Sequence, residues 1–240
     1  MMFSNSPKIK FYCSLPEVKD KYPIISAKDF RPHWAKASAL AYKEFVKNTP
    51  AHVRTTGTVK CPGIRDISSR GFILQSWFDF SILTTSNSIE FQYAVPQGLV
   101  EHLKESGFKK DLIEWFSGDV PQVAIPLAKN DLQTLLKIAT PWVVSIPKGW
   151  SLLIMPIPYS DEPEFTATHG LLERGDFYEI NPILKWHKRP GELLVKAGTP
   201  LCQLIPVKDE FIECEILGYN AEIKQKERNW LFNMVHSFSK

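Results

Sequence analysis

Apolar residues recur at helical spacing near both ends of the chain and predict a helix at each place. Residues 33–48, HWAKASALAYKEFVKN, predict a helix that packs on the rest of the protein. Its apolar stripe is formed by Trp34, Ala37, Leu40, Ala41 and Phe45. After Asn220, a good N-cap residue, a second amphipathic pattern predicts a C-terminal helix. The apolar stripe of that helix contains Ile223, Trp230, Leu231, Met234, Val235 and Phe238.

Between these helices the pattern changes to the alternation of apolar and polar residues that is typical of strands. Residues 8–13 predict a short strand, and residues 71–85 and 88–95 predict two strands joined as a hairpin. Residues 141–207 continue as short apolar runs with turn signals about every 8 to 12 residues, which is the spacing of a sandwich or barrel. Nine of the 18 prolines lie in this last region, at the ends of predicted strands.

These patterns divide the chain into three segments. We expect residues 1–60 to form a basic strand-and-helix segment packed on the core, and residues 61–218 to form the β core itself. A helical insertion is expected within the core at about 97–137, with short helices in its first half and a further helical turn at 129–137. We expect residues 219–240 to form the C-terminal helix.

Charge is nearly balanced over the whole chain but uneven along it. The 29 basic and 26 acidic residues give a net charge of +3, which makes a nucleic-acid partner unlikely on composition. Residues 1–60 hold eleven basic and four acidic residues, a balance of +7, so the remainder carries −4. This segment either meets an acidic or phosphate surface, or is a solvated face that pairs with the acidic remainder of the same protein. The wide spacing of its lysines favours the second interpretation.

Targeting signals and cysteine pairs are not evident in the sequence. No stretch approaches the roughly 20 consecutive apolar residues of a membrane helix, and the first residues lack the apolar region of a secretory signal. We therefore expect a protein that is not secreted and has no membrane partner. The four cysteines are too far apart for a zinc knuckle, and we expect no disulfide.

Common catalytic motifs do not occur in the chain. There is no GxSxG, GxGxxG or GxxxxGK[ST] sequence, so serine-hydrolase, Rossmann and P-loop functions have no local support. None of the six histidines stands two residues before an acidic residue, and His169 and His187 are weak candidates for a metal site only if they converge in space. The acidic cluster at Asp161, Glu162 and Glu164 lies between prolines, and solvation of a surface loop explains it.

Residues 170–208 resemble the C-terminal half of the barrel of dUTPases and dCTP deaminases. The matching positions are Gly170, Leu171, Leu172, Glu173 and Phe177, followed by Ala197, Gly198, Leu201, Cys202, Gln203 and Leu204. The resemblance implies an α+β, mainly β fold: a distorted dUTPase-like or jelly-roll-like barrel with peripheral helices and a C-terminal amphipathic helix. For an enzyme it implies Mg²⁺, Glu173 positioning water, Ser151 near a phosphate and Gln203 at the base. The arginine of the family's phosphate-binding element is absent here, as is its glycine-rich C-terminal arm.

Several short segments follow one another in a characteristic order: residues 8–13, 31–34, 60–66, 71–80, 141–156, 170–181 and 198–208. This order also resembles that of a family of unknown function encoded by tailed phages and some bacteria. The first hypothesis is therefore a non-enzymatic phage-type structural or interaction protein, virion-associated or accessory, without cofactor, in the host cytoplasm or virion. Its partners are expected to be proteins, as a homo-oligomer or as virion subunits. The expected contact residues are Lys8, Lys10, Trp230, Leu231, Met234 and Phe238. The alternatives are a dUTPase-like nucleotide-binding or nucleotide-hydrolysing enzyme, and another barrel enzyme that uses His169 and His187.

Overall fold

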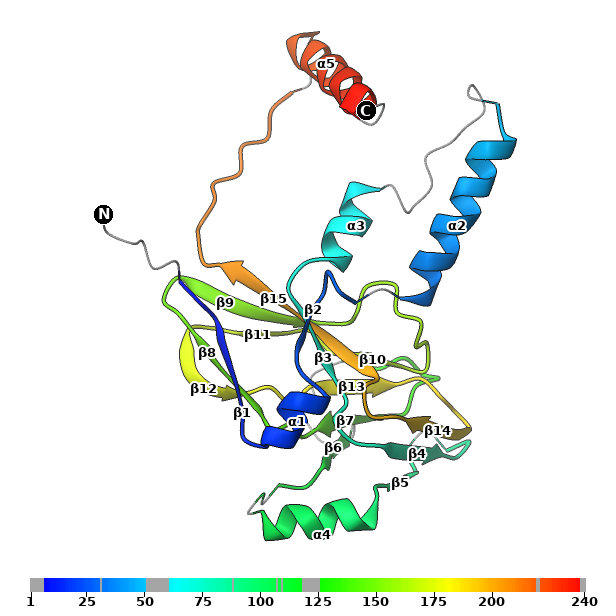
Figure 1. The fold of residues 1–240 in the computed structure, drawn as a ribbon, viewed down its shortest axis with the longest axis vertical. Helices are drawn as coiled ribbons and strands as arrows, with labels where there is room; N and C mark the ends of the chain where they lie inside the picture. Colours follow the sequence, from blue (N-terminus) through cyan, green and yellow to red (C-terminus); the bar gives the residue numbers. More distant parts are fainter. Residues whose placement is uncertain are drawn as a thin grey trace. The chain divides into compact units, whose positions relative to one another are not determined.

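Four antiparallel sheets and five helices make up the part of the chain that the computed structural model describes (Figure 1). The described residues are 7–30, 32–50, 61–87, 89–106, 108, 110–117, 126–218 and 221–237. They fall into two units, a body that ends at Asp209 and a C-terminal unit, Glu210–Lys240. The mainly β, α+β fold predicted from the sequence is confirmed. No helix in the described ranges is long and apolar enough to cross a membrane.

The largest sheet runs in the order β11, β9, β15, β3, β2, and every pairing in it is antiparallel. Its strands are β11 (Gly170–Leu172), β9 (Trp150–Met155), β15 (Pro200–Lys208), β3 (Phe72–Gln75) and β2 (Ile25–Ser26). A second sheet contains β10 (Phe165–Ala167), β13 (Ile183–Trp186), β7 (Thr134–Ile138) and β6 (Ile113–Ser117). The third contains β14 (Gly191–Val195), β4 (Phe80–Thr84) and β5 (Phe91–Ala94), and the fourth contains β1 (Lys10–Cys13), β8 (Trp142–Ile146) and β12 (Gly175–Glu179).

Four of the helices belong to the body. They are α1 (Pro16–Lys21), α2 (His33–Asn48), α3 (Pro62–Ser68) and α4 (Gln97–Glu105). In Figure 1, α4 lies beside β5 and β6, the two strands that it connects along the chain. The fifth helix, α5 (Ala221–Ser237), belongs to the C-terminal unit and begins next to the predicted N-cap.

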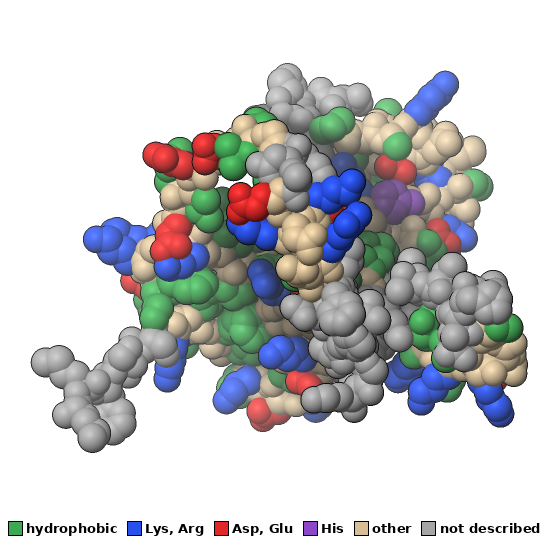
Figure 2. Space-filling view, turned by 90° about the horizontal axis from the view of Figure 1, so that it is seen from above, with side chains coloured by type: hydrophobic (Ala, Val, Ile, Leu, Met, Phe, Trp, Pro, Cys, Tyr) green, Lys and Arg blue, Asp and Glu red, His purple; other side chains and the backbone are tan. Residues whose placement is uncertain are grey.

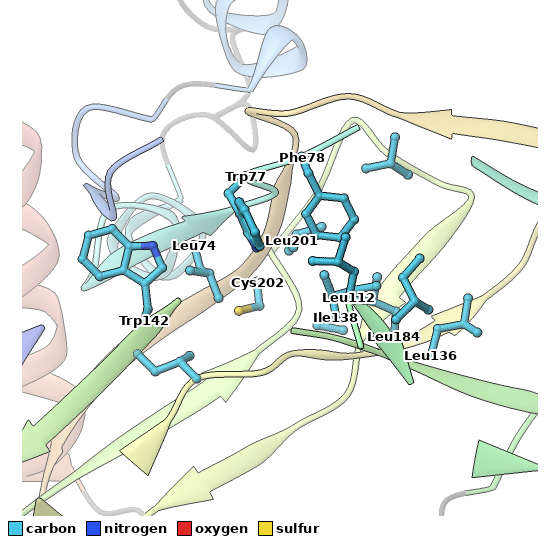
Figure 3. Packing of buried hydrophobic residues seen from close by; sticks show 14 of the residues in the cluster. Leu74, Trp77, Phe78, Leu112, Leu136, Ile138, Trp142, Leu184, Leu201 and Cys202 are labelled. Atoms are coloured by element: carbon cyan, nitrogen blue, oxygen red, sulfur yellow. The ribbon is translucent and has the colours of Figure 1, made fainter. Parts of the chain in front are cut away.

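One apolar core joins the sheets of the body. Figure 3 shows part of it, where Trp77 and Phe78 lie near Leu201, Leu112 and Ile138. The Trp77 indole donates a hydrogen bond of 2.9 Å to the Ala139 carbonyl, so its polar atom is satisfied inside the core. The strands alternate as expected for half-buried sheets, with every second residue of β8 buried.

The cysteines are all free thiols that differ in exposure. Cys61 and Cys214 are exposed, and Cys13 is half-buried. Cys202 lies in the core on β15, and burial raises the pKa of its thiol to about 12. Cys202 therefore behaves as a small apolar core residue rather than as a nucleophile.

The predicted helical insertion at 97–137 is mostly wrong. Only α4 is helical, whereas residues 113–117 and 134–138 are the paired strands β6 and β7. The residues of β7, Thr-Leu-Leu-Lys-Ile, are good helix formers in part, but four of the five are buried. Burial on both faces of a central strand outweighs the local helix preference.

Two further predictions are corrected in detail. Residues 71–85 form two strands in different sheets, β3 and β4, although the hairpin of β4 and β5 is confirmed. The chain bends between them, where the buried Ser76 hydroxyl donates to the Phe78 carbonyl at 2.7 Å. The apolar stripe of α2 is not buried as predicted, because Leu40 is 65% exposed and only Trp34 packs partly on the body.

Candidate functional site

The three residues predicted for a dUTPase-like reaction lie in three different environments. Glu173 is exposed in the turn between β11 and β12. The Ser151 hydroxyl is buried on β9 and donates to Asp209 Oδ1 at 2.6 Å. Gln203 is fully buried on β15, and its Nε2 donates to the backbone carbonyls of Ile67 at 2.8 Å and Arg70 at 2.5 Å. Both amide protons of Gln203 are thus used by the fold.

The two histidines predicted as weak metal candidates do not form a metal site among the described residues. His169 is exposed after β10. His187 has both ring nitrogens occupied, Nδ1 by Asp131 Oδ1 at 3.0 Å and Nε2 by Thr166 Oγ1 at 2.9 Å. No group of three or more His, Cys, Asp or Glu side chains in the described ranges could hold a metal ion.

Two hydrogen bonds link Asp131 to His187 and His187 to Thr166. They give the order of carboxylate, imidazole and hydroxyl that activates nucleophiles in hydrolases. None of the three is among the lining residues of the four described cavities, so no substrate site is assigned to them. The contact therefore ties the loop at Asp131 to β10 and to the end of β13.

A cleft of about 300 Å³ lies between the segment that follows β2, the first half of α2, and α3. Its apolar walls come from Ala27, Phe30, Pro32, Trp34, Ala39 and Ile64, and two serines, Ser68 and Ser69, close one side. Three cations, Lys28, Lys36 and Arg65, also line it, and none of the described lining residues is acidic. Figure 2 shows Lys and Arg side chains around patches of apolar surface on the molecule seen from above.

Backbone contacts at the edge of the main sheet hold two walls of this cleft. Gly71, between α3 and β3, adopts φ +77, and a Cβ on it would lie 2.1 Å from the Leu204 carbonyl oxygen of β15. Its own carbonyl accepts the Ala27 N–H at 2.9 Å. Only glycine fits this close approach in the left-handed region. The buried amide of Gln203 thus fixes the end of α3 to β15, and the Gly71 carbonyl fixes the segment at Ala27 to the start of β3.

The acidic loop after β9 fixes the start of α2. Asp161 Oδ1 accepts the backbone N–H of Trp34 at 3.2 Å, in the first turn of the helix. A carboxylate there meets an otherwise unpaired N–H and the positive end of the helix dipole. The Trp34 ring also meets the Tyr159 ring edge to face, with centroids 5.8 Å apart. The loop that the sequence explained by solvation alone therefore has a structural role.

The chemistry of the cleft is that of an anion-binding apolar site. Arg65 touches Asp66 at 3.3 Å, but both side chains are about 60% exposed, so this pair screens little of the guanidinium charge. Lys28 and Lys36 add two further positive charges. The Trp34 Nε1 atom is buried and has no hydrogen-bond acceptor in the described structure. The indole nitrogens of Trp142 and Trp186 in the core are likewise without an acceptor there.

Sequence reasoning did not find this cleft. The one feature of the sequence that indicates the cleft is the basic excess of residues 1–60, which includes Lys28 and Lys36. Arg65, the third cation of the cleft, lies outside that segment. The other cavities are less suited to a charged ligand. The one of about 520 Å³ beside β5 is formed around the exposed ring of Trp115, which meets Phe91 and Tyr93.

No protein-family model matches the chain, and no curated protein matches it. Solved structures of dUTPases resemble part of it. A mutant dUTPase from phage phi11 of S. aureus, described with a structural Mg(II) ion, is 14% identical, and the match covers 46% of this chain and 99% of that chain at a TM-score of 0.30. The EIAV dUTPase is 11% identical, over 62% of this chain and 84% of that chain, at a TM-score of 0.32. A mutant dUTPase of Staphylococcus bacteriophage 80alpha with dUpNHpp is 14% identical, over 45% and 81%, at 0.29. At these values the likeness carries no inference about activity.

Proposed function

We propose that the protein is a non-enzymatic interaction module, of a phage-type virion-associated or accessory kind, that binds an acidic segment of a protein partner. The cleft between α2 and α3 carries this proposal. The cleft has three cations and apolar walls, and none of its described lining residues is acidic. The Trp34 indole N–H has no acceptor among the described residues. An acidic peptide with an apolar centre supplies each complement: carboxylates for the cations, a carbonyl for the indole, and an apolar anchor for the apolar walls.

The composition of the lining favours a peptide over a nucleotide. The described lining has no Asn or Gln to read the edge of a base, and the hydroxyl of Ser68 already donates to the Ile64 carbonyl at 2.7 Å. It also has no carboxylate to share a metal ion with a triphosphate. A volume of about 300 Å³ is at the lower end for small-molecule sites and suits a single side chain.

A dUTPase-like function is the second candidate because two of its predicted residues are neighbours along the main sheet. Glu173 directly follows β11, whose last residue, Leu172, pairs with Leu152 of the antiparallel strand β9. Ser151 directly precedes Leu152 in β9. Among the described residues, no group of three or more His, Cys, Asp or Glu side chains could hold a metal ion, and no reaction step is derived through Mg²⁺. Hydrolysis of dUTP in the presence of Mg²⁺ would support this candidate.

We also propose that the module works as a homo-oligomer in the host cytoplasm or the virion. Trp230 supports this part because it lies on α5 and is 58% exposed. The other predicted contacts of that helix fall outside the description: the side chains of Leu231 and Met234, and the whole of Phe238. Loss of assembly in Trp230→Ala, measured by light scattering, would assign α5 to the interface.

Fluorescence anisotropy with labelled synthetic peptides tests the cleft. The probe is EEFLEE, and the matched controls are QQFLQQ, which lacks the charge, and EEAAEE, which lacks the anchor. We expect EEFLEE to bind, both controls to bind at least about tenfold more weakly, and added salt to weaken binding. Equal binding of the three peptides would contradict the proposal.

Two charge-reversed variants locate the binding on the surface. Lys28→Glu with Arg65→Glu changes the cleft, whereas Lys43→Glu with Lys47→Glu makes the same change of charge elsewhere on α2. The first variant should lose about tenfold or more in affinity for EEFLEE, and the second should stay within about twofold. Equal losses would indicate only a general effect of net charge.

A further inference from the structure

The segment that begins the C-terminal unit exposes large apolar side chains without forming any regular structure. Residues 211–218 are neither helix nor strand. Phe211 is 94% exposed, Ile212 81% and Ile216 94%. Such a cluster on a short extended segment indicates that it is covered by another surface when the protein functions.

The sequence of this segment has the period of a half-buried strand. Ile212, Cys214 and Ile216 occupy alternate positions and would share one face of an extended chain. Glu213 and Glu215 lie between them and would share the opposite face. The segment thus has the pattern of a strand, with an apolar face and an acidic face, but pairs with no strand in the described structure.

A strand edge with the complementary pattern lies at β1. In the described part of the chain β1 pairs with β8 alone, so its other edge is open. Lys8 and Lys10 are exposed at alternate positions, whereas Ile9 and Phe11 pack partly against the core. An open edge presents unpaired N–H and carbonyl groups to an incoming strand.

We infer that residues 211–215 of one molecule add as an antiparallel strand to β1 of a second copy. The register that matches the two patterns places Glu215 opposite Lys8 and Glu213 opposite Lys10. The same register places Ile212 opposite Phe11, Phe211 opposite Tyr12 and Cys214 opposite Ile9. Antiparallel pairing agrees with all the described ladders of the body. The inference rests on the oligomeric part of the proposed function, and it assigns the surfaces of the oligomer.

Complementary charge reversal tests the pairing between molecules. Lys8→Glu with Lys10→Glu and Glu213→Lys with Glu215→Lys should each weaken self-association about 30-fold, because both cross-strand ion pairs become repulsive. An equimolar mixture of the two variants should recover association, since attraction returns across the mixed interface. Sedimentation equilibrium measures each case. A wild-type protein that stays monomeric, or a mixture that does not recover, would overturn the inference.

A cysteine cross-link tests the register. Opposed residues of antiparallel strands have Cα atoms about 4.5 to 5.5 Å apart, which a disulfide spans. In a Cys61→Ser background, Ile9→Cys should form an intermolecular disulfide with Cys214 on oxidation. Lys10→Cys, whose side chain leaves the opposite face of β1, should not. Equal cross-linking of both variants would contradict the register.

The cleft variant separates this inference from the peptide-binding proposal. Lys28→Glu with Arg65→Glu should lose the EEFLEE peptide yet keep wild-type self-association. If instead it loses self-association while Lys8→Glu with Lys10→Glu keeps it, the acidic segment binds the cleft and the assignment to β1 is wrong. Failure of peptide binding with intact self-association would refute the cleft proposal alone.

Discussion

Replacing Gln203 distinguishes a structural amide from one that recognises a base. In the structure, Gln203 Nε2 donates two hydrogen bonds, to the Ile67 carbonyl at 2.8 Å and the Arg70 carbonyl at 2.5 Å. Gln203→Met keeps the approximate volume and removes both donors. A side chain that only met a ligand could be replaced with little effect on the free energy of unfolding.

The expected loss follows from these two bonds and from one opposing effect. Each bond contributes about 0.5–1.5 kcal/mol net, so removing both costs about 1–3 kcal/mol. The Oε1 atom of Gln203 is buried without a partner, and its removal returns part of that cost. We therefore expect Gln203→Met to lower the free energy of unfolding by about 2 kcal/mol.

Urea unfolding followed by circular dichroism measures this difference. The matched control is Gln92→Met on β5, where the glutamine is exposed and the change should stay within about 0.5 kcal/mol. The Gln203 variant should also bind EEFLEE more weakly, because the amide holds the end of α3. If the unfolding free energy of Gln203→Met lies within about 0.5 kcal/mol of the wild-type value, the structural role is refuted. A difference of that size is about the error of the method.

Two further substitutions and one labelling experiment have expected outcomes. Gly71→Ala should lower the free energy of unfolding by about 3 kcal/mol or more, because its Cβ would meet a backbone carbonyl oxygen at 2.1 Å in the left-handed region. Gly63→Ala in α3 has open space around the new Cβ and should be neutral or stabilising. Thermal unfolding compares the two variants. Cys202 should resist thiol reagents until the protein unfolds, while the exposed thiols react at once, as mass spectrometry of alkylated protein would show. A side-chain hydrogen bond from Lys110 lowers the pKa of Glu179 below 4.5, so the stabilisation is present above that pH and lost as the pH falls through the folded-state pKa. Glu179→Gln should be less stable than wild type at pH 7, and the difference in unfolding free energy should shrink as the pH falls through the folded-state pKa of Glu179, by urea titration.

The elements with a strong local pattern could be predicted from the sequence. The hairpin of β4 and β5 and the helices α2 and α5 occur where periodicity placed them. The strand β7 could not be predicted, because its preference for a strand comes from burial between β13 and β6, which no local pattern reports. The apolar stripe of α2 shows the opposite. Its helical spacing predicted burial, but no surface of the described body covers it.

The site was harder to predict than the fold. Arg65 and Lys28 lie far apart in the sequence and line one cleft because Gln203 holds the end of α3 to β15 and the Gly71 carbonyl holds the segment after β2. Gln203 was recognised as a special residue, but its buried position gives it a partner in the backbone rather than in a ligand. Asp161 looked like part of a solvated loop because its acceptor role requires the start of α2 beside it.

The indole resonance of Trp34 reports directly on occupation of the cleft. The chain has seven tryptophans, so a ¹H–¹⁵N spectrum should contain seven indole signals, and Trp34→Phe assigns the one required. Titration with EEFLEE should move this signal as Nε1–H gains an acceptor, and QQFLQQ should leave it in place at the same concentration. A Trp34 signal that does not move while the peptide binds would show that the peptide lies elsewhere and would contradict the proposed function.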